Sequence, residues 1–207
     1  VPVNSWSTTF IARTETCKKR ITGTGSQPLY VWDKSVSVET GWANVANTSI
    51  SLDLDERTEL SYTNHSNTGD TIKLTKGKVW VRQVSSIGRL EMKNLSVITK
   101  EWSIAMLEQT NPVFIIVYAI QWDVTISTSI GDYTLKAGNR IMLSATELSN
   151  PSLQLSSQVG TIDEDITKNA LFIKNNWKSI LNNLTNTPTN TGTTSTGWDS
   201  PTVGNDV

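Results

Sequence analysis

The sequence predicts a mainly β protein: a two-sheet sandwich or β-solenoid-like domain with one C-terminal amphipathic helix and an extended polar tail. Three observations support this class. Residues 112–119 contain an unbroken apolar run rich in β-branched and aromatic side chains, typical of a strand covered on both faces. Elsewhere, short alternating segments are separated by turn residues about every 8 to 12 positions. Residues 161–184 alone carry a clear helical period.

The apolar run is predicted to be the middle of the β core. Its apolar block of roughly eight residues is far shorter than the roughly 18 to 20 needed to cross a bilayer. From Ile120 the pattern becomes alternating, with Ile120, Trp122, Val124 and Ile126 on one side. Alternation predicts that one face of the strand meets the core and the other meets water, which would place Trp122 in the core.

Further strands are expected before and after this run, and Gly, Asn and Asp residues mark the turns between them. Residues 23–28 are read as a turn or loop, and residues 55–57 as a tight acidic turn. The predicted strands are Trp6–Ala12, Leu29–Val38, Thr48–Leu54, Thr58–Tyr62, two pieces on either side of Gly77 within Thr71–Val84, Leu90–Ile98, Trp102–Leu107, Tyr133–Leu135 and Arg140–Ser144.

One helix is expected over 161–184, packed on a β domain that spans residues 1–160. Thr161 and Glu164 have the spacing of a capping box. An apolar stripe of period 3.6 follows, formed by Ile166, Ala170, Ile173, Trp177, Ile180, Leu181 and Leu184.

Residues 185–207 form a tail dominated by Thr, Asn and Gly. Such a segment buries too little surface to order itself, so we expect it to gain shape only against its own domain or a neighbouring copy. Trp198 is its one large anchor, the usual form of an interface hot spot. Trp198, Pro201 and Val203 are the candidate partner-binding residues.

The composition limits the classes of partner that the chain can bind. The 207-residue chain has a net charge of -1 and only 18% charged residues, so it lacks the basic excess that nucleic-acid binding requires. The single cysteine, Cys17, excludes an intrachain disulfide and leaves a buried thiol, a surface thiol or a dimer disulfide. The Thr/Ser/Asn-rich composition favours a location outside the cytoplasm. A start at Val1 without Met suggests that a signal or anchor has been removed.

Three segments resemble the FecR domain, the extracytoplasmic β domain of iron-responsive transmembrane signalling proteins. They are Ser51–Leu60, Ile72–Val81 and Val124–Ile141, within a core of about residues 49–144. Each repeats the family's strand–turn–strand pattern, with Gly77 and Gly138 in turns. The resemblance implies a mostly β domain without enzyme activity that binds proteins outside the cytoplasm. No sigma-factor-binding segment or membrane span is recognised.

The sequence contains no pattern that predicts a catalytic, metal-binding or cofactor-binding residue. His65, the only histidine, lies in a Ser/Asn/Gly-rich loop. Asp53, Asp55 and Glu56 could hold calcium but lack the spacing of a recognised loop, and a turn explains them better. Trp80, Trp122 and Trp177 lie in apolar patterns and are expected in the core. Stacking on sugars is the alternative for the less clearly assigned tryptophans, Trp32, Trp42, Trp102 and Trp198.

The function expected from the sequence is a non-enzymatic, extracytoplasmic structural or interaction protein, a self-assembling filament subunit of the cell surface or extracellular space. It would be a homo-oligomer or polymer without nucleic acid. Two alternatives are the periplasmic sensor domain of a FecR-type regulator, which binds a receptor, and a carbohydrate-binding surface module, which binds a glycan.

Overall fold

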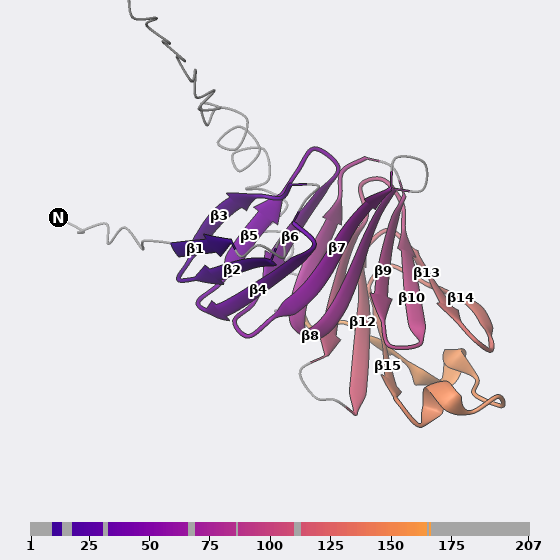
Figure 1. The fold of residues 1–207 in the computed structure, drawn as a ribbon. Helices are drawn as coiled ribbons and strands as arrows, with labels where there is room; N and C mark the ends of the chain where they lie inside the picture. Colours follow the sequence, from indigo (N-terminus) through magenta and orange to yellow (C-terminus); the bar gives the residue numbers. More distant parts are fainter. Residues whose placement is uncertain are drawn as a thin grey trace, which may run out of the picture.

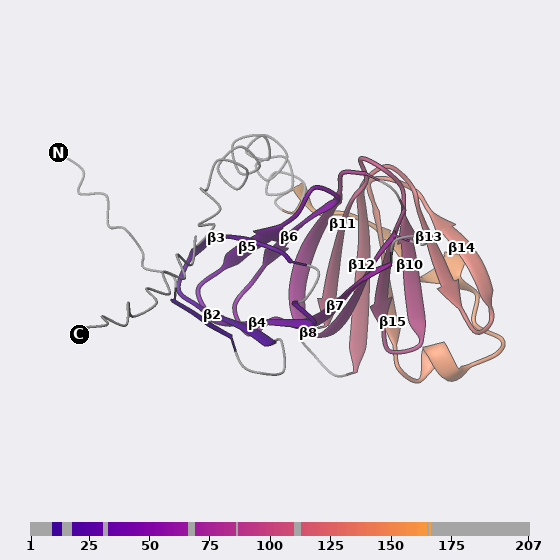
Figure 2. The same cartoon turned by 45° about the horizontal axis from the view of Figure 1, so that its top comes forward.

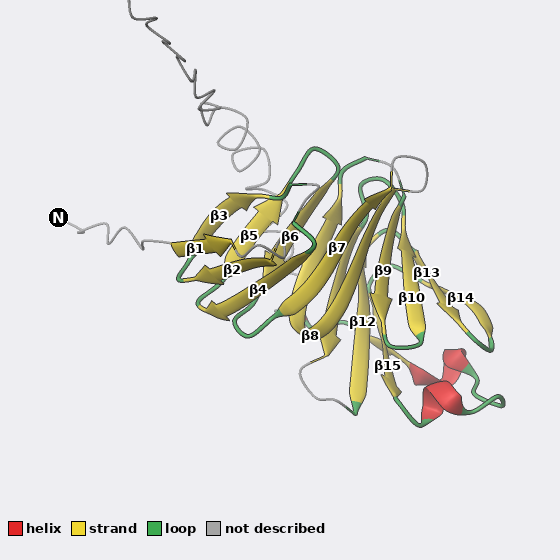
Figure 3. Ribbon diagram, viewed as in Figure 1, coloured by secondary structure: helices red, strands yellow, loops and turns green. Residues whose placement is uncertain are grey.

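The computed structural model describes residues 10–13, 18–30, 33–65, 69–85, 87–109, 113–164 and 166. Nearly all of its regular structure is β (Figure 3). The strands form two sheets that face one another, and the long strand β8 (Gly69–Gln83) belongs to both. The mainly β class predicted from the sequence is therefore confirmed.

Each sheet places its strands in ascending chain order, and the chain crosses repeatedly between the two sheets, so many neighbours within a sheet are not consecutive in sequence. Figure 1 shows this order from β1 at one end of the molecule to β14 at the other, and Figure 2 shows β2 and β4 on one side with β3, β5 and β6 on the other. Sheet 1 contains, in spatial order, β1 (Phe10–Arg13), β2 (Lys18–Thr22), β4 (Ser35–Thr40), β7 (Glu59–His65), the first half of β8, β9 (Gly88–Met92), β10 (Leu95–Thr99), β13 (Val124–Thr128) and β14 (Gly131–Leu135).

Sheet 2 lies opposite and carries the short 3-10 helices η1 (Glu147–Ser149) and η2 (Leu155–Gln158) near its last strands. Its strands are β3 (Gly25–Pro28), β5 (Ala43–Ala46), β6 (Ile50–Leu54), the second half of β8, β11 (Ile104–Gln109), β12 (Phe114–Gln121), β15 (Asn139–Ser144) and β16 (Val159–Thr161).

The chain passes between the sheets at corners, most of which carry one residue in the left-handed backbone region. A residue with positive φ turns the chain sharply out of its strand, and glycine adopts this conformation without a Cβ clash. Seven crossings in the described residues share this feature: Gly23, Gly41, Arg57, Gly77, Trp102, Trp122 and Gly138, with φ between 60° and 97°. The strand registers place the first four at one end of the strands and the last three at the other.

The corner at Gly77 shows how closely these crossings interlock. Gly77 is the point where β8 leaves sheet 1 for sheet 2, at φ +97°. A Cβ there would lie 2.5 Å from the Cα and the Oγ1 of Thr58. The Thr58 hydroxyl in turn donates to the Lys78 carbonyl at 3.0 Å and accepts from the Lys78 N–H at 3.1 Å. The β6–β7 corner is thereby locked against the bend in β8.

The core between the sheets is apolar, and two buried polar contacts cross it or close its end. The side-chain amide of Asn47 donates to the Tyr62 hydroxyl, which donates to Asp70, both at 2.8 Å. Lys19 and Asp33 form a 3.2 Å ion pair that is almost wholly buried. Removing one partner of such a pair would leave the other charge buried and unpaired. The ion pair therefore holds the segment before β4 in place.

Several expected elements are wrong in detail. Residues 25–28, read as a loop, form β3, while the predicted strand Leu29–Val38 becomes a strand only from Ser35. Leu90–Ile98 is a hairpin of β9 and β10 that turns at Lys93. The central run 112–126 is not one strand: β12 in sheet 2 ends at Gln121, and β13 starts in sheet 1 at Val124.

Most of the C-terminal predictions concern residues that the structure does not describe. Thr161, predicted to cap the helix, is the last residue of β16 and pairs with Asn139. The remaining residues of the predicted helix, beyond 166, and the tail with Trp198, Pro201 and Val203 are not described. No helix in the described ranges is both long and apolar enough to cross a membrane.

The two glycine corners Gly77 and Gly138 make a matched test of this interlocking. Gly77→Ala adds a backbone penalty of about 1 kcal/mol and a clash with Thr58, whereas a Cβ at Gly138 would meet nothing within 4 Å. Urea unfolding should therefore show a loss of about 1 kcal/mol for Gly138→Ala and at least about 2 kcal/mol for Gly77→Ala. Equal losses would contradict the proposed role of the Thr58 contact.

Candidate functional site

Three corners lie side by side at one end of the sheets and form the most distinctive exposed surface of the described chain. Trp102 precedes β11, Trp122 follows β12, and Gly138 precedes β15. The Gln121 side chain donates to the Trp102 carbonyl at 3.3 Å, and the Gly138 N–H donates to the Ala119 carbonyl at 2.8 Å. These contacts join the corners into one surface, which we call the tryptophan corner.

Both tryptophans occupy a backbone conformation that bulky residues rarely adopt. The φ angles are 67° for Trp102 and 68° for Trp122. A side chain other than glycine costs about 1 to 2 kcal/mol in this region. The rings do not recover that cost by full burial, because Trp102 is 49% exposed and Trp122 is 59% exposed. Strain and exposure together indicate that these residues are not placed for folding alone.

Beside Trp122 is an open cleft of about 300 Å³, lined by Lys100, Glu101, Trp122 and Asp123. Asp123 is held in place there: its Oδ2 accepts from Lys136 Nζ at 2.8 Å, and its Oδ1 accepts from the Ala137 N–H at 2.9 Å. The hydrogen bond from Lys136, followed by the one from Ala137, lowers the pKa of the Asp123 carboxyl. Asp123 therefore presents a fixed carboxylate beside an aromatic surface.

The Lys100 side of the cleft is equally ordered at its backbone. The Lys100 N–H donates to the Ser103 hydroxyl, and the Ser103 N–H donates to the Lys100 carbonyl, both at 3.0 Å. The Trp102 N–H donates to the Gln83 carbonyl at 2.9 Å. The loop that carries Lys100 and Glu101 is thus a closed turn attached to β8. A ligand at this cleft would meet a preformed surface.

A second polar cluster lies on the outer face of sheet 2. The side-chain amide of Asn44 donates to Ser51 Oγ at 2.9 Å and to Asp53 Oδ1 at 3.2 Å. Asp53 pairs across the strands with Trp80. Burial raises the pKa of Asp53 to about 6, against a smaller opposing effect of the bond from Asn44. Three enclosed atoms of the cluster lack hydrogen-bond partners: Asn44 Oδ1, Asp53 Oδ2 and Trp80 Nε1.

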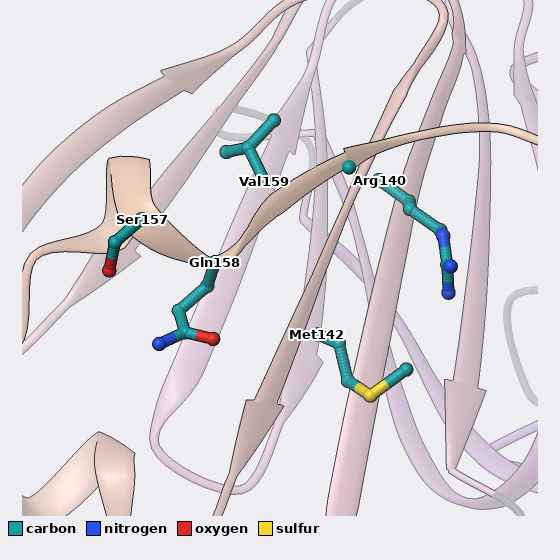
Figure 4. A pocket seen from close by; sticks show the side chains of 6 residues that line it. Arg140, Met142, Ser157, Gln158 and Val159 are labelled. Carbon is teal, nitrogen blue, oxygen red and sulfur yellow. The ribbon is translucent and has the colours of Figure 1, made fainter.

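Two other clefts are weaker candidates for a binding site. One, of about 180 Å³, lies between β15 and the η2–β16 segment, where Arg140 and Met142 face Ser157, Gln158, Val159 and Gly160 (Figure 4). The other, of about 320 Å³, lies near Arg57, and its charges include the exposed pairs Arg20–Glu39 at 3.3 Å and Lys76–Glu59 at 3.1 Å. Exposed ion pairs of this kind contribute little stability and mark a solvated surface.

Several residues singled out in the sequence lie elsewhere in the structure than predicted. Trp122 was expected in the core and is instead more than half exposed, because its alternating pattern runs across a corner. Trp80 is half-buried on the outer face of sheet 2, and Trp42 is an exposed residue beside the Gly41 corner. His65 ends β7, and its side chain is outside the described set.

The acidic group Asp53, Asp55 and Glu56 does not converge as a calcium site. Asp53 bonds to Asn44, and the Asp55 carboxylate accepts from the Glu56 N–H at 2.9 Å. Within the described ranges, no three His, Cys, Asp or Glu residues lie close enough to bind a metal ion together. Sequence reasoning missed Lys100, Glu101 and Asp123, since only the corner geometry brings these separated positions to one cleft.

Comparison with known proteins supports the fold. No family model matches the chain, and no curated protein matches its sequence. Two crystal structures of Parabacteroides distasonis proteins, each described as a "putative anti-sigma factor", are similar to it. One has 12% identity and a TM-score of 0.52, covering 67% of this chain and 64% of the other. The second has 13% identity and a TM-score of 0.49, covering 54% and 55%. The chain thus spans less than two thirds of either neighbour.

The strain at Trp122 can be measured with two substitutions that remove the same ring. Alanine keeps the Cβ that makes φ 68° unfavourable, whereas glycine does not. The free energy of unfolding of Trp122→Gly should therefore be about 1 kcal/mol higher than that of Trp122→Ala. At Trp42, whose φ is not positive, glycine should be the less stable variant. The same order at both positions in urea unfolding would exclude backbone strain at Trp122.

Asp53 should make stability depend on pH. Its folded-state pKa lies above the unfolded value, so its stabilising contribution is complete below about pH 4 and is lost as pH rises through 6. The loss is on the order of 3 kcal/mol. Asp53→Asn removes this titration, so its stability relative to the native chain should increase between pH 4 and 7. Asp55→Asn, at the solvent-accessible turn, is the control. Parallel pH profiles for the native chain and Asp53→Asn would contradict the burial effect.

Proposed function

We propose that this chain is a non-enzymatic protein-interaction domain that works outside the cytoplasm and assembles with further copies of itself. The observation that carries the proposal is the open-ended order of the two sheets. Sheet 1 ends at β1 and β14, and sheet 2 ends at β3 and β16, each pairing with one neighbour among the described strands. Unpaired strand edges are templates for adding a strand from another chain.

The edges of sheet 1 suit such a contact better than those of sheet 2. β1 has four residues and β14 has five, whereas β16 has three and β3 ends at Pro28, which has no N–H to donate. The two edges also differ in charge. β1 carries Arg13 and is followed by the basic strand β2, whereas β14 carries the exposed Asp132.

We therefore infer a head-to-tail contact in which β14 of one copy pairs with β1 of the next. A contact between two different surfaces repeats without closing unless the rotation happens to form a ring, so it produces a filament. The polar tail with Trp198, Pro201 and Val203 would add a second contact to the neighbour. A filament subunit at the cell surface or in the extracellular space is the function that this arrangement supports best.

A second candidate is the partner-binding domain of a FecR-type transmembrane signalling regulator. It is favoured by the fold shared with the Parabacteroides distasonis protein described as a "putative anti-sigma factor", at a TM-score of 0.52. In this reading the same β domain binds a receptor protein and does not polymerise. Binding of a different protein with 1:1 stoichiometry by a monomeric chain would favour this candidate.

Self-assembly can be tested with one edge variant, one tail variant and a matched control. Asp132→Lys places like charge on both ends of sheet 1, and deletion of residues 186–207 removes the tail. Both should shift the sedimentation profile towards monomer and remove filaments from electron micrographs while the β circular dichroism signal stays unchanged. Glu56→Lys makes the same charge change at an exposed corner away from the edge and should assemble normally.

Three results would contradict parts of this proposal. A native chain that stays monomeric at all accessible concentrations would exclude self-assembly. Normal filaments of Asp132→Lys would exclude the β14 edge, and normal filaments of the truncated chain would exclude the tail.

A further inference from the structure

We propose that the cleft at the tryptophan corner is a carbohydrate-binding site, in which a neutral sugar ring stacks on the indole of Trp122. This ligand is distinct from the protein partner proposed above, and the inference does not depend on self-assembly. It follows from three features of the corner: an exposed aromatic ring held at a strained position, a preformed polar rim, and a balance of charges.

Tryptophan is an unfavourable residue for a corner with positive φ. Among the described residues, seven corners carry a residue with positive φ, and four of these are glycines, which adopt the conformation without penalty. Trp122 occupies an equivalent position against the local backbone preference and leaves 59% of its surface exposed. Backbone outliers of this kind concentrate at binding sites, where the structure around them holds a side chain in place for a ligand.

The side chains around the cleft match the chemistry of a sugar ring. A sugar ring has an apolar face of C–H groups and an edge of hydroxyls, so it needs an aromatic surface beside hydrogen-bonding groups. Trp122 supplies the surface, Lys100 can donate, and Glu101 and Asp123 can accept. The cleft volume of about 300 Å³ lies at the lower end of the range for small-molecule sites, which fits one or two sugar rings.

The charges around the cleft cancel one another. Lys100 and Lys136 balance Glu101 and Asp123, and Lys136 lies 2.8 Å from the Asp123 carboxylate. A site without net charge gives no electrostatic preference to anionic or cationic ligands, which favours a neutral glycan. Because Asp123 is already fixed by Lys136 and Ala137, it would accept a ligand hydroxyl without further ordering.

The rim argues against a protein partner at this cleft. The centres of protein–protein interfaces are depleted of charged residues. Here three of the four residues that line the cleft are charged, and Trp122 is the only apolar one. A protein that covered these charged side chains would have to supply a matching partner group for each of them. A sugar hydroxyl can both donate and accept a hydrogen bond, so it can bond to any of the three.

The test uses the full chain and a panel of neutral hexasaccharides of glucose, N-acetylglucosamine and mannose, with sialylated and sulfated glycans for comparison. We expect at least one neutral hexasaccharide to bind with a dissociation constant on the order of 0.1 to 1 mM in calorimetry, because a shallow cleft buries little ligand. Trp122→Ala and Trp122→Gly should each weaken binding by about tenfold or more. Glu101→Gln should weaken it less.

Trp42→Ala is the matched control, because Trp42 is a 46% exposed tryptophan at a different corner and should bind as the native chain does. Deletion of residues 186–207 should also leave glycan binding intact, which separates this inference from the proposed assembly. Circular dichroism of each variant verifies folding. The inference is overturned if no neutral glycan binds, if only charged glycans or a protein partner bind, or if folded Trp122→Ala and Trp122→Gly bind as tightly as the native chain.

Discussion

The structure depends on one recurring constraint: the chain must turn out of one sheet and into the other over a short connection. A left-handed residue meets this constraint at seven of the described crossings, and the long strand β8 meets it at Gly77 while remaining in both sheets. Because the corners keep consecutive strands near one another, both sheets grow in chain order. The apolar core is then a continuous layer between them, with residues such as Leu52, Val81 and Leu107 fully enclosed.

The corners also explain where polar groups are buried. A tight crossing leaves backbone groups that no strand partner satisfies, so side chains near the ends of strands take their place. At the β6–β7 corner, Thr58 bonds both backbone groups of Lys78. In the β5–β6 hairpin, Asn47 accepts in the same way from the N–H groups of Ser49 and Ile50, and its side-chain amide donates to Tyr62 in the opposite sheet. These contacts connect the two layers near the ends of their strands.

The functional surface arises from the same constraint. Where the corner residue is glycine, that residue itself projects no side chain into solvent. Where it is tryptophan, the turn projects a ring into solvent beside the charged residues of the neighbouring turn. The cleft is therefore assembled from residues that are separated along the chain and joined only through adjacent corners. The polar cluster around Asp53 is different, since it lies on the outer face of sheet 2 and contains buried atoms without partners.

The sequence by itself determined the mainly β class, the tight turn at residues 55–57 and the strand at 140–144, because alternation and turn residues are local signals. It could not determine that residues 112–126 divide between two sheets, since apolar alternation continues through the corner and a tryptophan carries no local signal for positive φ. The exposed position of Trp122 and the cleft beside Lys100, Glu101 and Asp123 were decided only by tertiary structure. The physical reason is that the backbone conformation at a corner is imposed by the pairing of strands on both sides of it, whatever residue stands there.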